Sequence, residues 1–75
     1  MILTDGTHLI SDKSVEELHT FASNLGLKCL WFQNHRSHPH YDLTTRRMSN
    51  KAILHGAVLV SSVEIVKKCH IMYDP

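Results

Sequence analysis

The stretch SVEELHTFASNLGL, residues 14–27, contains a complete helix with both of its ends marked. Ser14 is a favourable N-cap, and Glu17 three residues later completes a capping box. Gly26 stands where a left-handed residue commonly ends a helix. Apolar residues recur between these ends at helical spacing, which predicts one side that lies on a core. That side consists of Val15, Leu18, Ala22 and Leu25.

Extended segments are expected on both sides of this helix. Before it, residues 1–4 favour a strand, Asp5-Gly6 favours a turn, and residues 7–10 favour a second strand. After it, residues 28–33 (KCLWFQ) predict another strand, and residues 34–40 predict a polar loop.

Two more helices are expected in the second half of the chain. The first begins near Thr44 or Thr45 and ends before Gly56. Residues 57–60 (AVLV) then predict a short buried strand, and Ser61 is placed to cap a third helix.

This order of elements predicts the fold class. Strands and helices alternate, which is typical of an α/β fold with right-handed crossovers. We therefore expect a β-α-β-α-β-α unit of two or three layers with a short, mostly parallel sheet. With 75 residues in all, the chain is expected to form a single domain over residues 1–75.

Composition narrows the class of protein. The chain is 43% hydrophobic and 20% charged, as soluble globular domains are, and its apolar stretches are too short to cross a bilayer. Residues 1–12 do not have the pattern of a signal peptide. Cys29 and Cys69 are expected as buried thiols, which suggests a cytoplasmic location. Because so small a core is marginal, we expect a homo-oligomer or a bound ligand.

Histidine is the unusual component. Seven His accompany a net charge of +1, and protonating all of them would raise the charge to +8. Acidity should therefore increase affinity for anions. The balance of fixed charges is not that of a nucleic-acid-binding protein, so a nucleic-acid partner is not favoured.

The predicted topology places a ligand site beyond the carboxyl ends of the strands, where the helix N-termini also point. Ser11 and Asp12 follow one strand there, and the polar loop follows the next. If residues 35–42 (HRSHPHYD) are extended, His38, His40 and Asp42 lie on one side at a period of two.

Three interpretations of that segment remain open. The two imidazoles and the carboxylate could hold Zn²⁺ or a similar cation. They could instead bind a phosphate, with Arg46 and Arg47 arriving in the first turn of the next helix. The segment could also be a solvated connection. We favour the phosphate site, and no metal or other cofactor is favoured.

The segments HLISDKSVEELHTFASNLGL, WFQ, HPHYDL, GAVLVSS and EIVKK carry a resemblance over roughly residues 8–68. The chain resembles a family of short bacterial and phage proteins that is catalogued only as a domain of unknown function. The resemblance implies one compact unit, and it implies no activity. The positions that match the family pattern are His8, Asp12, Glu17, His19, Trp31, His40, Tyr41 and Asp42.

The favoured function is a small binding module for a phosphorylated, nucleotide-derived ligand. By analogy with some small phage proteins of this size, it could sequester a host nucleotide signal. A small hydrolase or lyase is the alternative, with His40 as general acid or base, oriented by Asp42 and helped by Tyr41 or His8. A macromolecular interaction protein is the third. The expected ligand-binding residues are His8, Ser11, Asp12, His38, His40, Tyr41, Arg46 and Arg47.

Overall fold

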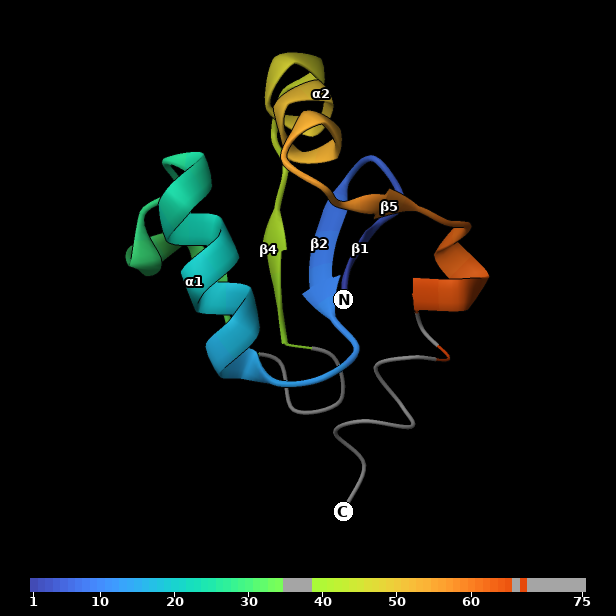
Figure 1. Cartoon of the computed structure of the whole chain (residues 1–75), viewed down its shortest axis with the longest axis horizontal. Coiled ribbons are helices and arrows are strands. Elements are labelled where there is room, and N and C mark those ends of the chain that lie inside the picture. Colours follow the sequence, from blue (N-terminus) through green and yellow to red (C-terminus); the bar gives the residue numbers. More distant parts are fainter. Residues whose placement is uncertain (35–38, 66, 68–75) are drawn as a thin grey trace.

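The computed structural model describes residues 1–34, 39–65 and 67, and it contains a five-stranded sheet with helix α1 packed on one face (Figure 1). The spatial order of the strands is β3-β4-β2-β1-β5. Their bounds are β1 Ile2–Thr4, β2 His8–Ser11, β3 Phe32–Gln33, β4 His40–Asp42 and β5 Val58–Leu59. The helices are α1 Val15–Leu25, the short 3₁₀ helix η1 Cys29–Trp31 and α2 Arg46–Leu54.

The sheet is mixed and mostly antiparallel, so the prediction of a mostly parallel sheet is wrong. β1 pairs antiparallel with β2, β2 with β4, and β4 with β3, while β5 pairs parallel with β1. The first reason is the Asp5-Gly6 turn, because a tight turn between adjacent strands produces an antiparallel hairpin. The second is β4, a strand that begins at His40, where the predicted polar loop over residues 34–40 ends.

Helix α1 begins and ends where the sequence predicts. Ser14 Oγ accepts the N–H of Glu17 at 3.0 Å, and Gly26 adopts a φ of 96° at the C-cap. Only half of the capping box forms, because the Glu17 carboxylate accepts the hydroxyl of Ser11 at 2.6 Å instead. The backbone N–H of Ser14 also donates to Ser11 Oγ, at 3.1 Å. The start of α1 is therefore fixed to the end of β2.

The sheet separates two apolar clusters. The larger cluster lies between the sheet and α1 and contains Leu9 and Tyr41 from the middle strands together with Leu18 and Ala22 from α1. The smaller cluster lies on the opposite face and consists of Leu3, Ile10 and Ile65, with Val60 packed against it. Since alternate residues of a strand face opposite sides, each strand contributes to both faces.

The predicted strand over residues 28–33 is wrong for its first part. Cys29–Trp31 forms the 3₁₀ helix η1 on the surface, and only Phe32–Gln33 joins the sheet. Leu30 is 86% exposed and Trp31 46% exposed. Cys29 is also exposed, which contradicts the expectation of a buried thiol, whereas Cys69 lies outside the described residues.

The second helix is confirmed, and the segment after it is only partly as predicted. Thr45 Oγ1 accepts the N–H of Met48 at 3.1 Å and caps α2. The expected buried strand at 57–60 shrinks to β5, whose two residues are exposed because β5 lies at the edge of the sheet. Ser61 caps the helical residues 62–65, as predicted, through the N–H of Glu64 at 3.2 Å. Among the helices of the described residues, none has the length and apolar character that a membrane span requires.

Candidate functional site

Three potential ligand side chains gather on the face of the sheet opposite α1. His8 of β2 pairs directly with Asp42 of β4, and side chains of paired residues lie on the same face. His40 is two residues before Asp42 in β4 and therefore lies on that face too. One ligand atom from each of His8, His40 and Asp42 lies within 4.8 Å of the others. We call these three residues the histidine cluster.

The histidine cluster is accessible from solvent but not fully exposed. His40 Nε2 lies 3.2 Å from Asp42 Oδ1, and the side chain of His40 is only 13% exposed. The rings of His8 and His40 meet edge to face, with 5.2 Å between their centroids. The side chains of His8 and Asp42 are each nearly half exposed, so a small ligand could approach the cluster between them.

Asp5 supports the histidine cluster from the turn between β1 and β2. Its carboxylate lies 3.1 Å from His8 Nδ1 and accepts the backbone N–H groups of Thr7 and His8 and the hydroxyl of Ser62. Burial alone would raise the pKa of Asp5, but the hydrogen bonds from His8, Thr7 and Ser62 outweigh it and hold the pKa well below its usual range. Asp5 is thus a fixed anion that orients the His8 ring. Sequence reasoning assigned Asp5 only to a turn.

A pocket of about 330 Å³ adjoins the histidine cluster and shares Asp42 with it. One part of its lining is apolar and comes from η1, α2 and the segment after α1. The other part is polar and comes from β3, the end of β4 and the start of α2. The lining residues are Leu27, Leu30, Trp31, Gln33, Asp42, Thr44, Thr45 and Met48.

A family model described as "Protein of unknown function (DUF4031)" matches residues 4–72, which include Asp5 and the whole histidine cluster. The chain belongs to the DUF4031 family. No curated protein and no solved structure matches this DUF4031 chain.

The predicted rim of ligand-binding residues does not assemble in the DUF4031 chain. Because β2 and β4 are antiparallel, the carboxyl end of one strand lies beside the amino end of the other, and their carboxyl ends point in opposite directions. Ser11, at the end of β2, is fully buried beneath the start of α1, and Asp12 is paired with the Met1 amine at 2.9 Å. His8 and His40 are the predicted site residues that the structure brings together.

Tyr41 faces away from the histidine cluster. Its side chain is 1% exposed in the larger apolar cluster, and its hydroxyl lies 2.7 Å from His19 Nδ1. Burial raises the pKa of Tyr41, with a smaller contribution from Cys29. The alternation along β4 explains this position, since Tyr41 lies between His40 and Asp42 and must point to the other face.

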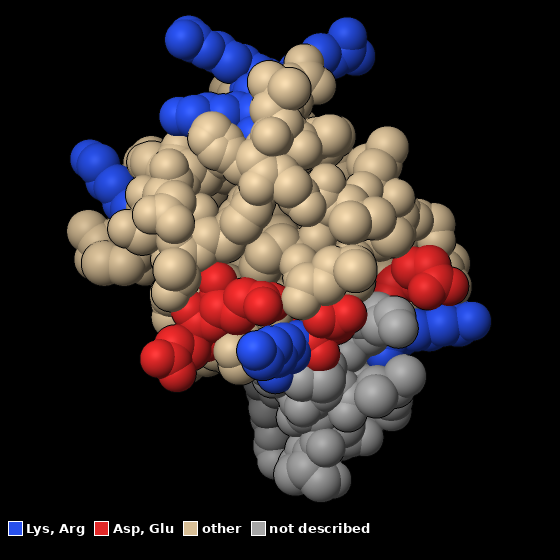
Figure 2. All heavy atoms as spheres, in the orientation of Figure 1, with Lys and Arg blue, Asp and Glu red and all other residues tan. Residues whose placement is uncertain are grey.

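The two arginines of α2 lie elsewhere again. Arg46 and Arg47 are exposed and line a separate hollow together with Asn50, Lys51 and Leu54. On the face shown in Figure 2, Lys and Arg side chains gather over α2, whereas acidic side chains lie around the N-terminal end of α1. His38, which was expected beside His40, lies outside the described residues.

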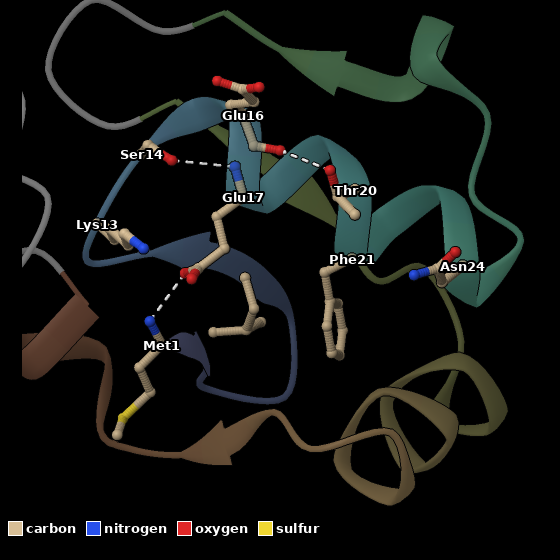
Figure 3. A pocket seen from close by; sticks show the side chains of 9 residues that line it. Met1, Lys13, Ser14, Glu16, Glu17, Thr20, Phe21 and Asn24 are labelled. Atoms are coloured by element: carbon tan, nitrogen blue, oxygen red, sulfur yellow. Dashed lines mark hydrogen bonds and ion pairs between the residues drawn. The ribbon is translucent and has the colours of Figure 1, made fainter.

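A hollow of about 630 Å³ beside the first turns of α1 is less suited to an anion (Figure 3). Glu16 and Glu17 line it, and the Met1 amine lies 2.8 Å from Glu17 Oε1. The carboxylates would repel a phosphate, and the amine is already paired with Glu17 and Asp12. We therefore place the candidate site at the histidine cluster and the adjoining pocket.

Proposed function

We propose that this domain binds a phosphorylated small molecule, of which a nucleotide-derived compound is the favoured class, in the pocket that adjoins the histidine cluster. The observation that carries this proposal is the division of the pocket into an apolar part with an exposed indole and a polar part at the start of a helix. Its volume of about 330 Å³ lies within the range of small-molecule sites.

The apolar part of the pocket suits a flat ring. Trp31 lies in the lining with much of its indole exposed, and Leu30 and Met48 also line the pocket. Lys28 Nζ lies 5.8 Å from the centroid of the indole, which keeps a cation close to this side. A base stacked on Trp31 would bury apolar surface of both rings.

The polar part of the pocket suits the phosphorylated end of such a ligand. Thr44 and Thr45 lie in the lining immediately before α2. The first N–H groups of a helix have no partner within the helix, and the helix dipole adds a partial positive charge there. A phosphate at this end of α2 would accept hydrogen bonds from backbone N–H groups and threonine hydroxyls.

The test compares ligands with and without the phosphate. Calorimetric titration with a nucleoside monophosphate should show binding, and the uncharged nucleoside should bind at least about tenfold more weakly, since one charged hydrogen bond corresponds to about 1.5–3 kcal/mol. Trp31→Ala should weaken binding of the monophosphate. Leu54→Ala is the matched control, because Leu54 is exposed and lines a different hollow. Equal affinity for the two ligands would contradict the proposal and favour a surface for contact with a macromolecule.

A hydrolase is the second candidate because of one contact. The 3.2 Å separation of His40 Nε2 and Asp42 Oδ1 is one at which a carboxylate can orient an imidazole for proton transfer. Recovery of the ligand after incubation distinguishes the two functions. An intact monophosphate supports binding alone, and release of inorganic phosphate supports hydrolysis.

A further inference from the structure

The histidine cluster has the composition of a metal site as well as a position beside the pocket. We propose that His8, His40 and Asp42 bind a divalent transition-metal ion, with Zn²⁺ as the reference ion. This site is independent of the proposed phosphate pocket, although the two share Asp42. It also differs from the ligand set considered from the sequence, because His8 from β2 takes the place of His38.

The donor set favours an ion of the zinc class. Two imidazole nitrogens and one carboxylate oxygen are ligands that Zn²⁺, Co²⁺ and Ni²⁺ accept readily, whereas Mg²⁺ and Ca²⁺ prefer oxygen alone. Three protein ligands leave at least one coordination position open, which is typical of sites that act on a ligand and not of closed structural sites.

The distances are close to those that one ion would impose. Two ligand atoms that each lie about 2.0–2.2 Å from a tetrahedral ion are about 3.4 Å apart. The separation of His40 Nε2 and Asp42 Oδ1 is already 3.2 Å. All three ligand atoms lie within 4.8 Å of one another, so a small contraction of the cluster would bring them to the separations that one ion imposes. The half-exposed side chain of His8 has room for such a movement.

Asp5 supplies the second layer of contacts that metal-binding histidines need. Its Oδ2 lies 3.1 Å from His8 Nδ1, which leaves Nε2 as the coordinating atom of His8. The Asp5 side chain is 6% exposed and is fixed by Thr7 N at 2.9 Å and by Ser62 Oγ at 2.9 Å. A carboxylate held in this way fixes both the tautomer and the direction of the ring.

A bound cation would also change the adjoining pocket. Among the described residues that line the pocket, Asp42 is the only charged one, and its carboxylate alone would repel a phosphate. A metal ion at the histidine cluster would neutralise that charge and offer the phosphate an open coordination position. This consequence rests on the proposed function, whereas binding of the ion itself does not.

The test is a titration of the full chain, first freed of metal by a chelator, with Zn²⁺ alone and with Co²⁺ alone. We expect one ion per chain in calorimetry and visible absorption of bound Co²⁺. His8→Gln, His40→Gln and Asp42→Asn should each weaken Zn²⁺ binding at least about tenfold, and Asp5→Asn should do so while leaving all three ligands in place. His55→Gln is the matched control, because His55 lies at the C-cap of α2. Circular dichroism establishes that each variant is folded.

Two results would overturn the metal site. One is a folded chain that binds neither ion at millimolar concentration. The other is binding that survives His8→Gln but is lost in His38→Gln or His55→Gln, which would place the ion elsewhere. Titration of a nucleoside monophosphate with and without Zn²⁺ then addresses the shared Asp42. A negative result in that titration, with Zn²⁺ still bound, would contradict the phosphate pocket and leave the metal site intact.

Discussion

Tyr41 illustrates how far single residues can be interpreted from the sequence. The period of two that places His40 and Asp42 on one face also sends Tyr41 to the other, where its ring packs with Phe32 and His19. The sequence therefore already contained the signal that separates Tyr41 from the site. By contrast, no local pattern brings His8 to His40, because that contact depends on how β2 pairs with β4.

Replacement of Tyr41 by Phe should reduce stability without affecting either proposed site. Loss of the hydroxyl leaves the His19 ring without its 2.7 Å partner, which should cost about 1 kcal/mol in the free energy of unfolding. The pH dependence has a defined sign. Because the pKa of Tyr41 is raised in the folded state, its contribution to stability is complete below about pH 10 and is lost as the pH rises through the raised value. Urea unfolding at pH 7 and pH 11 measures both effects, and loss of Zn²⁺ binding in this variant would contradict the assignment.

Asp5 should matter more to stability than an ordinary surface carboxylate. It accepts the N–H groups of Thr7 and His8, and its other oxygen contacts the His8 ring and Ser62. Asp5→Ala should therefore lower the free energy of unfolding by about 1.5–3 kcal/mol or more, since hydrogen bonds to a charged group are the stronger ones. Asp12→Ala is the control, because its ion pair with the Met1 amine is exposed and should contribute less than about 1 kcal/mol. Equal losses in the two variants would show that Asp5 does not fix the turn.

The elements differ in how well the sequence predicts them. Helix α1 carries both of its end signals locally, and the structure places its cap residues at Ser14 and Gly26. Strand β4 has only three residues and carries the polar pattern His-Tyr-Asp. The sequence therefore does not distinguish it from the polar loop that precedes it. The 3₁₀ helix η1 is not predicted either. Leu30 and Trp31 are apolar and favour a buried strand, but both lie on the surface.

Ser11 fixes the junction between β2 and α1, and its removal should weaken that helix. Its hydroxyl donates to Glu17 Oε1 at 2.6 Å and accepts the N–H groups of Lys13 and Ser14. Ser11→Ala should lower the free energy of unfolding by about 1–3 kcal/mol, because buried polar groups lose their partner. Thermal unfolding followed by circular dichroism measures the change. Unchanged affinity for Zn²⁺ is also expected, and a large loss in a folded variant would contradict the structural role of Ser11.

The whole molecule depends on pairings that a single sequence does not contain. An alternation of strands and helices is compatible with either direction of pairing, and the mixed sheet arises from a hairpin at one end and the insertion of β4 beside β2. The predicted rim of ligand-binding residues depended on that pairing, because a parallel sheet would gather the carboxyl ends of its strands on one side. The sequence singles out the polar segment 35–42, and two of its residues, His40 and Asp42, belong to the histidine cluster.

The edge strand β5 gives the last expectation, which concerns assembly. β5 is the outermost strand on its side of the sheet described here, and Val58, Leu59 and the nearby Val63 are exposed apolar residues. An exposed apolar edge strand is prone to pair with another chain, and a core this small gains from additional burial. We therefore expect a homo-oligomer at micromolar concentration in sedimentation velocity.

Leu59→Lys should shift the chain toward a monomer, because a charge at the edge disfavours pairing. Leu30→Lys, in η1 and even more exposed than Leu59, should leave the assembly unchanged. A wild-type chain that sediments as an 8.6 kDa monomer would contradict this expectation.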